Sequence, residues 1–406
     1  MKNSILLLTL FLCFFSVSVD AQYVSLSESS EVSILTIGPG AQLYDKFGHS
    51  AFRIQDSVQG IDVVYNYGVY DFETPNFYTK FAQGKLLYKL VVNSYAPFSE
   101  SYIRQNRWIK EQILDLSDTE KQEIFNFLQN NAKPENMFYK YDFFYDNCAT
   151  KIRDVLVTVL GDDLVYQNKI APEGKTFREL IQQNVYSNSW GSLGMDVAIG
   201  AVVDKKATAW EYQFLPDYVF EGAAHATLNN APLIKETVVL HNNIPKEEKR
   251  NFFSSPLYVF GLLSVLILWV TWKDFRTKDR SRYLDSILFF VTGLIGVFLL
   301  LLWTATDHTA TANNYNMLWA FPLNLFLIWA IGKSKPKRWL ARYVFFLILL
   351  FGLLGIHWIT GVQVFAAGFI PLFIVLILRY LYVFYFLKKQ NALSEVVQPI
   401  TGHDKK

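Results

Sequence analysis

Cysteine is nearly absent from this chain of 406 residues, which has only Cys13 and Cys148. Cys13 lies in the apolar core of residues 1–21, a segment with a basic start and a small residue, Ala21, at its end. This pattern is typical of a cleavable secretory signal, so we expect the mature chain to begin near Gln22. The mature chain then has a single cysteine, which excludes an intrachain disulfide. Zinc-type cysteine spacing is also lacking, and we expect neither a metal nor a cofactor.

An excess of charge of either sign is lacking as well. The 38 Lys and Arg residues are balanced by 36 Asp and Glu residues, which leaves a formal net charge of +2. A nucleic-acid-binding domain usually has a strongly basic face. We therefore exclude nucleic acid as a partner.

Apolar residues are abundant instead. They make up 51% of the chain, 17% of it is aromatic, and the mean hydropathy is +0.17, values that indicate a membrane protein. After residue 253 we find five runs of roughly the 20 residues that a membrane-spanning helix needs. We place these spans at 256–272, 284–303, 315–332, 342–360 and 364–387.

The loops between these runs predict the orientation. Basic residues are concentrated at 273–282, at 333–342 and after Lys388, whereas 304–316 has no Lys or Arg. Basic loops remain in the cytoplasm. We therefore divide the chain into a signal (1–21), an exported domain (22–253), a transmembrane domain (254–388) and a cytoplasmic tail (389–406).

The exported domain has the pattern of an α+β fold. Residues 50–55, 62–70 and 85–95 are short β-branched and aromatic runs that predict strands. Ser117 and Glu120 have the spacing of a capping box and predict a helix over 118–130, and Thr176 and Glu179 repeat the device before a later helix.

Cys148 is predicted to lie in the first turn of a helix. It recurs with Ile152 and Val155 at helical spacing, and the preceding Asp146 and Asn147 are favourable N-cap residues. Helix N-termini stabilise thiolates, and the nearby Lys151 and Arg153 add positive charge. We interpret Cys148 as a nucleophile. The alternative is a small buried side chain without a chemical role.

A thiol nucleophile needs a base, and the chain has six histidines. His49 opens a predicted strand directly after Gly48, where a sheet can hold the ring rigidly. Spacing alone does not select among the histidines. The others are His225 and His241 at expected surface or edge positions, His308 in an exported loop, His357 near the outer end of a span, and His403 in the tail.

Two motifs carry a resemblance to a known family. "YDKFGHSAFRIQD" at 44–56 and "YKYDFFYDNCATKIRD" at 139–154, ahead of a multi-span tail, resemble the Lnb-type lipoprotein N-acyltransferases of certain bacteria. The resemblance implies a permuted papain-like exported domain, related to the lecithin:retinol acyltransferase and peptidoglycan endopeptidase group, followed by five transmembrane helices. It also implies the bacterial inner membrane, with the catalytic domain in the periplasm.

The resemblance further implies an activity and its residues. Cys148 would take an acyl chain from a phospholipid as a thioester and pass it to the α-amine of a diacylglyceryl lipoprotein, with His49 as base. Asn66 would orient His49, and Asn147 would cap the helix or donate to an oxyanion. Asp62, Tyr67 and Asp71 are alternatives to Asn66, and Tyr67 and Asp71 are also candidate substrate contacts.

Several interpretations remain open. Asp307 and His308 would touch head groups or the active site, or form a polar turn between spans. Residues 190–218 would line the mouth of the site or form a covering loop and short helix. The chain would alternatively be a membrane-tethered cysteine peptidase or cell-wall amidohydrolase, or a non-catalytic envelope sensor.

Overall fold

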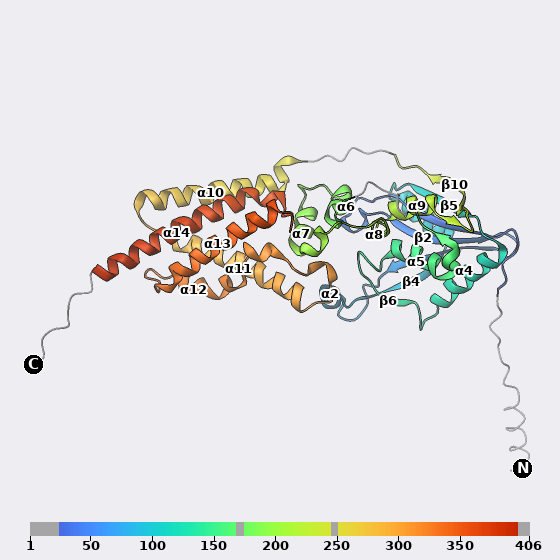
Figure 1. Ribbon diagram of the computed structural model, residues 1–406, viewed down its shortest axis with the longest axis horizontal. Helices are drawn as coiled ribbons and strands as arrows, with labels where there is room; N and C mark the ends of the chain where they lie inside the picture. The colour runs from blue at the N-terminus through green and yellow to red at the C-terminus, as the bar shows by residue number, and fades with distance from the viewer. Residues whose placement is uncertain (1–23, 168–173, 245–250, 397–406) are drawn as a thin grey trace, which may run out of the picture.

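The chain folds into two parts that follow one another along the long axis of the molecule (Figure 1). The computed structural model describes residues 24–167, 174–244 and 251–396. The predicted signal and most of the predicted tail, including His403, lie outside these residues. The N-terminal part is an α+β domain, as predicted, and the C-terminal part is helical.

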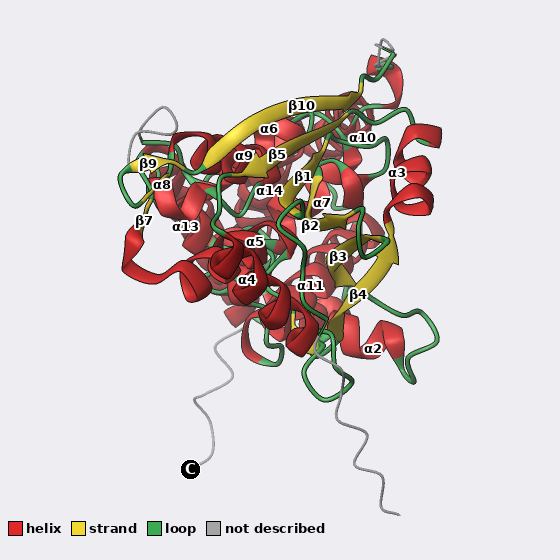
Figure 2. Ribbon diagram, turned by 90° about the vertical axis from the view of Figure 1, so that its right-hand side faces the viewer, coloured by secondary structure: helices red, strands yellow, loops and turns green. Residues whose placement is uncertain are grey.

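The centre of the α+β domain is a seven-stranded antiparallel sheet, whose strands lie side by side in Figure 2. Its order is β10-β5-β1-β2-β3-β4-β6, so the strand that begins with His49 lies in the middle. The strands predicted at 50–55, 62–70 and 85–95 are confirmed as β2, β3 and β4. The bounds are β1 Glu31–Ile37, β2 His49–Asp56, β3 Ile61–Val69, β4 Leu87–Ser94, β5 Ile109–Leu114, β6 Phe138–Lys140 and β10 Ile234–His241.

Helices pack on both faces of this sheet. Alternate residues of the central strands, such as Ile34 and Phe52, pack on one face against α4 (Asp118–Asn131), α5 (Cys148–Leu160) and α9 (Pro216–His225). Leu35 and Ala51 face the other side, where Phe98 of α3 (Tyr95–Arg104) covers them. Both faces are therefore buried. The smaller elements are α2 Phe77–Ala82, α6 Phe177–Asn184, α7 Trp190–Ala198, α8 Ala209–Tyr212, β7 Leu164–Val165, β8 Thr227–Leu228 and β9 Ala231–Pro232, with 3-10 turns at Leu43–Asp45, Gly161–Asp163, Ala201–Asp204 and Phe252–Ser254.

The capping boxes predicted from the sequence are present. Ser117 and Glu120 close the start of α4, and Thr176 and Glu179 close the start of α6, each through reciprocal side-chain and backbone hydrogen bonds. The predicted helix at 118–130 is thus confirmed to within one residue.

Four helices of the C-terminal part are long and apolar enough to cross a membrane. They are α10 Pro256–Thr277, α11 Arg282–Thr304, α13 Trp339–Ile359 and α14 Ile370–Val396, and each overlaps one of the predicted spans. Because α14 continues to Val396, the first residues of the predicted tail are helical.

The third predicted span, 315–332, is not a continuous helix. It consists of 3-10 turns at Tyr315–Leu318 and Pro322–Leu327 and the short helix α12, Ile328–Ile331. Two glycines of α11 let this segment approach closely, because a Cβ on Gly296 would lie 2.0 Å from Ala320 O and one on Gly293 would lie 2.1 Å from Leu325 N. The buried Asn324 then donates to Thr292 at 2.9 Å and accepts from Tyr343 at 2.5 Å. Such side-chain partners make irregular backbone tolerable between helices.

The two parts of the chain are joined by a polar contact between residues 196–201 and 310–316. Asn314 donates to Val197 O at 2.8 Å, and Asn316 donates to Asp196 O at 3.0 Å. Gly200 N donates to Ala310 O at 2.8 Å, and a Cβ on Gly200 would lie 1.9 Å from Ala312 O. The 190–218 segment therefore folds as short helices, and its first half forms the joint between the domains.

Candidate active site

Cys148 is the first residue of α5, and Asn147 is its N-cap, as predicted. Asn147 Oδ1 accepts hydrogen bonds from the N–H groups of Ala149 and Thr150 at 2.8 and 2.9 Å, and Thr150 Oγ1 accepts from Asn147 N at 2.8 Å. Hydrogen bonds of this kind satisfy N–H groups that a helix start leaves unpaired. The helix start that holds the thiol is thus fixed by a complete capping box.

The side-chain amide of Asn147 has no proton left for an oxyanion. Its Nδ2 donates to Phe143 O at 2.7 Å and to Phe214 O at 2.8 Å, and the residue is buried. Of the two roles considered for Asn147, capping is the one that the structure supports. The interpretation of Asn147 as an oxyanion donor is wrong, because both amide hydrogens are already used.

His49 lies opposite the thiol and is oriented by Asn66. The ring of His49 hydrogen-bonds the Cys148 side chain, and His49 Nε2 lies 2.7 Å from Asn66 Oδ1. Because the Asn66 oxygen accepts, Nε2 carries a proton, which leaves Nδ1 to face sulfur. The structure thus brings together Cys148 from α5, His49 from β2 and Asn66 from β3.

The electrostatics of the pair shift the Cys148 thiol and the His49 ring toward their charged forms. Burial raises the pKa of the Cys148 thiol, but the charge and hydrogen bond of His49 and the backbone N–H groups of Ser50 and Ala149 lower it more, so the pKa lies below its ordinary value. Burial lowers the pKa of His49, but the Cys148 thiolate and the Asn66 oxygen outweigh it, so that pKa is raised. Opposite charges in contact stabilise one another in this way.

Two cations that the sequence suggested as activators are engaged elsewhere. Lys151 Nζ lies 2.6 Å from Asp146 Oδ1, and Arg153 lies 2.7 Å from Asp154 and over the Trp210 ring. The positive charge that acts most strongly on the thiol comes from His49.

The structure corrects the roles considered for two other residues of β3 and the turn after it. Tyr67 points to the opposite face of the sheet from Asn66, is 3% exposed in the core and accepts a hydrogen bond from Asn131 at 2.9 Å. Asp71 accepts from Glu73 N at 2.9 Å and lies 3.8 Å from Lys89 Nζ. Tyr67 is therefore a core residue rather than a substrate contact, and neither residue orients His49.

Asp62 is also committed to another partner. Its two oxygens accept from the Arg53 guanidinium at 2.8 and 2.9 Å, near the end of the hairpin far from His49. Among the candidates for the third position, Asn66 is the one whose side chain contacts the imidazole.

Asp307 and His308 attach a loop of the helical part to the α+β domain. Asp307 Oδ2 accepts from Lys140 at 2.9 Å, and His308 Nε2 lies 3.1 Å from Phe81 O. Their partners Lys140 and Phe81 are exposed on the domain surface, so in this structure the two residues hold the two parts together.

The remaining described histidines lie apart from the thiol. His225 Nδ1 hydrogen-bonds Glu221 O in its own helix, and His241 ends β10 at the sheet edge. His357 bonds Leu353 O in its own helix, and its ring lies 4.5 Å from that of Tyr315. In the described residues, no three His, Cys, Asp or Glu side chains lie together in a way that could hold a metal ion.

Sequence reasoning missed two neighbours of the site. Gly68 has φ +88°, and a Cβ there would lie 3.4 Å from Cys148 Cβ, so the bulged end of β3 passes directly beside the thiol. Arg107 is buried, donates to Gly38 O at 2.7 Å, and its charge acts on both Cys148 and His49. A glycine in a strand run is a sequence signal for close backbone approach, whereas nothing local marks Arg107.

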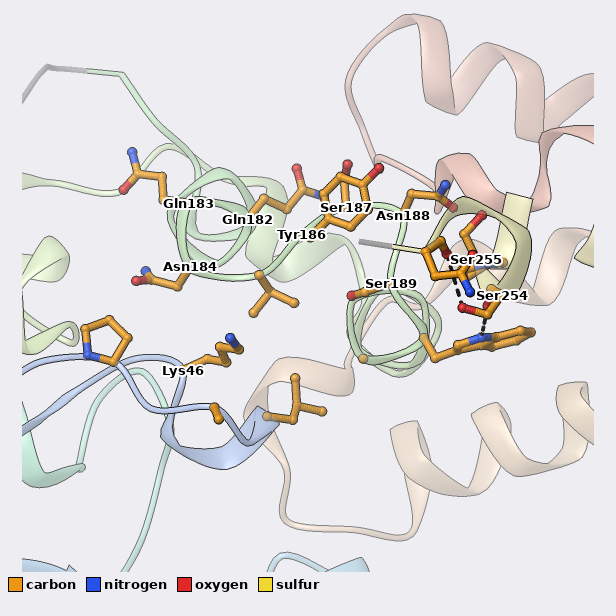
Figure 3. A pocket seen from close by; sticks show the side chains of 18 of the residues that line it. Lys46, Gln182, Gln183, Asn184, Tyr186, Ser187, Asn188, Ser189, Ser254 and Ser255 are labelled. Atoms are coloured by element: carbon orange, nitrogen blue, oxygen red, sulfur yellow. Dashed lines mark hydrogen bonds between the residues drawn. The ribbon is translucent and has the colours of Figure 1, made fainter. Parts of the chain in front are cut away.

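A separate groove of about 1150 Å³ lies where the domain meets the start of α10 (Figure 3). It is lined by residues 182–191, 251–256 and the loop at 39–46 that leads toward His49, with mostly amide and hydroxyl side chains. Trp190 Nε1 donates to Ser254 O at 2.8 Å along one wall. Cys148 and His49 are not among its lining residues in the part of the chain that is described.

Comparison with known proteins gives two matches to family models. Residues 20–183 match the Lnb N-terminal periplasmic domain, and residues 247–391 match the Lnb transmembrane domain. The two segments together cover most of the chain; the first covers the α+β domain up to α6, and the second covers the helical part. No curated protein and no solved structure matches the chain.

Proposed function

This chain belongs to the Lnb family, and on that premise we propose that it is a thiol-dependent lipoprotein N-acyltransferase. It is an inner-membrane protein with a periplasmic α+β domain and a helical membrane domain. The donor would be a phospholipid and the acceptor the α-amine of a lipoprotein's diacylglyceryl-cysteine. The observation that carries the proposal is the Cys148, His49 and Asn66 constellation at the start of a capped helix.

In the first half-reaction, the Cys148 thiolate attacks the carbonyl carbon of a phospholipid ester. A carbon–sulfur bond forms, the ester carbon–oxygen bond breaks, and the His49 imidazolium gives its proton to the leaving oxygen. The products are an acyl-thioester and a lysophospholipid. The backbone N–H of Cys148, together with that of Ser50 beside the sulfur, would stabilise the tetrahedral oxyanion, because the N–H groups of Ala149 and Thr150 already donate to Asn147.

In the second half-reaction, the lipoprotein amine attacks the thioester carbon. A carbon–nitrogen bond forms, His49 Nδ1 takes the proton of the amine, and the thiolate leaves. Asn66 keeps the same imidazole tautomer available in both halves by accepting from Nε2. The Cys148–His49 pair is thereby restored.

The fold and topology support the same proposal. The histidine strand β2 precedes the cysteine helix α5, which is the order of a permuted papain-like domain. Basic residues, including Lys273, Arg276 and Arg282, flank the ends of α10 and α11 far from the α+β domain, which supports a cytoplasmic location for that end and for the C-terminus. A membrane-anchored enzyme meets both lipid substrates in one leaflet.

Mass spectrometry of the N-terminal peptide of a model lipoprotein tests this function. The host should be depleted of its own N-acyltransferase and supplied with the intact protein or with Cys148→Ala. We expect an amide-linked third acyl chain with the intact protein only. A free amine in both strains, with both proteins present in the membrane, would overturn the proposal.

A further inference from the structure

An exposed aromatic surface surrounds the short helix α2. Phe72, Tyr78 and Phe81, named here the α2 aromatic cluster, are 66%, 79% and 52% exposed. Their rings are held by the buried Phe77, with ring-centroid distances of 4.8 Å to Phe72, 5.3 Å to Tyr78 and 6.2 Å to Phe81. Exposing an apolar patch of this kind to water is unfavourable. Such a patch therefore marks an interaction surface.

The position of α2 relative to the membrane is fixed by its contacts. Asp307 N donates to Gln83 O at 2.9 Å, and a Cβ on Gly84 would lie 3.0 Å from His308 N, so the loop after α11 lies against the end of α2. The 23 residues of α11 extend about 34 Å at 1.5 Å per residue, slightly more than the hydrocarbon thickness of about 30 Å. If α11 spans the bilayer, Thr304, its last residue, would lie near the edge of the hydrocarbon, and α2 would lie near the head groups.

The two ribbon views agree with this placement. α2 lies beside the end of α11 in Figure 1. Seen along the long axis in Figure 2, α2 is at the edge of the molecule rather than over its centre. In neither view does a helix of the described residues cover the outer side of α2.

We propose that the α2 aromatic cluster inserts into the outer leaflet of the membrane and docks the α+β domain on the lipid surface. Tyrosine and other aromatic rings favour the interface between hydrocarbon and head groups. Lys80 and Lys85 belong to the same segment, and lysine side chains at this level of a bilayer can pair with phosphate groups. The occupant is the phospholipid bilayer itself. This docking does not depend on the acyl-transfer activity.

A row of aromatic contacts connects the docked surface with the thiol. Tyr70 lies 5.9 Å from Phe77 and 5.4 Å from Tyr88, and Tyr88 stacks on Tyr141 at 4.3 Å. Tyr141 directly precedes Asp142, whose backbone is bridged to Asp146 just before Asn147 and Cys148. If the proposed function holds, this row is the apolar surface along which an acyl chain reaches Cys148.

Spin labelling tests the docking. Tyr78→Cys and Phe81→Cys are made singly in a Cys13→Ser, Cys148→Ser background, labelled with a nitroxide and reconstituted in phospholipid vesicles. Val58→Cys is the matched control, because Val58 is 70% exposed in the turn at the opposite end of β2 from His49. In power-saturation EPR, we expect oxygen to relax the α2 labels more than a water-soluble nickel chelate does, and the reverse at position 58. Equal behaviour at the three positions would overturn the proposal.

A second measurement separates this proposal from the proposed function. In a Tyr78→Ser, Phe81→Ser variant with Cys148 intact, we expect acyl transfer from vesicles to fall about tenfold, as for a loss of roughly 1.4 kcal/mol of lipid contact. Alkylation of Cys148 should be unchanged. If the unaltered protein transfers nothing, the proposed function fails, while the EPR result still decides the docking. Full transfer by the double serine variant would contradict a contribution of the α2 aromatic cluster to acyl transfer.

Discussion

At the scale of single residues, the chemistry depends on where Cys148 and His49 are held. A lone thiol in an exported chain pointed to reactivity, and the structure adds a partner, His49, that lowers the pKa of this thiol. The sequence could not select His49 from six histidines, because the pairing joins residues 99 positions apart through the packing of α5 on β2. Asn66 and Tyr67 are neighbours on a strand and face opposite sides of the sheet. The sequence alone does not show which of these sides faces His49.

The reactivity of the thiol should depend on His49. In His49→Ala the charge and hydrogen bond that lower the Cys148 pKa are lost, while burial, which raises it, remains. We therefore expect the apparent pKa for alkylation of Cys148 to rise, so that the rate at neutral pH falls. The measurement is the rate of iodoacetamide labelling against pH, with His225→Ala as the control. An unchanged profile in His49→Ala would refute the ion pair.

Asn66 should matter less than the pair it supports. Cys148→Ser and His49→Ala are expected to abolish transfer, and Asn66→Ala to reduce it by about one to three powers of ten, somewhat less than the roughly 10²–10⁴-fold that general-base assistance itself contributes. Asn66→Asp retains an acceptor for His49 Nε2 and should keep more activity than Asn66→Ala. Comparing kcat/KM of the two variants checks this. Equal losses would argue against orientation of the ring by Asn66.

Gly68 should be sensitive because of its contact with the thiol. Gly60 is a matched control: it has φ +66° against +88° for Gly68, but nothing lies within 4 Å of its added Cβ. Alanine at either position should cost about 1–2 kcal/mol of stability through the left-handed backbone. Only Gly68→Ala should also slow Cys148 alkylation, because its methyl group would crowd the thiol. Equal alkylation rates in the two variants would disprove a specific contact.

At the scale of elements, residues that act within one helical turn predicted where helices begin. Features that depend on contacts with distant residues could not be predicted from the sequence. The starts of α4, α5 and α6 were predictable because capping residues act within one turn. The span at 315–332 was apolar enough to be read as a helix. Its interruption depends on Gly293 and Gly296 of a different helix and on the buried Asn324, which no local pattern reveals.

At the scale of the whole molecule, the joint between the domains attaches the α+β domain and its candidate active site to the helical part. Arg178 is 1% exposed and binds Asp196 at 2.7 Å and Asp204 at 2.8 Å, which holds the 196–204 segment against the helical part. Arg178 attracted no attention in the sequence, because a single arginine in a helix is usually a surface residue. Its partners lie 18 and 26 residues away.

Arg178→Met should weaken this joint. Two buried carboxylates would lose their counter-charge, which costs about 3–5 kcal/mol in comparable buried pairs. We expect a lower melting temperature and faster proteolysis near residues 196–204. Lys205→Ala is the control, since its pair with Glu211 is partly exposed and such pairs contribute about 0–1 kcal/mol. Similar melting temperatures for the two variants would contradict a structural role for Arg178.

The central claim is that Cys148 carries the acyl chain as a thioester, and the most direct test is to trap that thioester. Purified protein is incubated with a phospholipid that has an isotope-labelled acyl chain, without acceptor, and the peptide containing Cys148 is analysed by mass spectrometry. The account predicts one labelled acyl group on Cys148, which hydroxylamine removes, and none on the peptide from Cys148→Ala. Acylation of a lipoprotein acceptor by Cys148→Ala protein at the rate of the unaltered protein would contradict it.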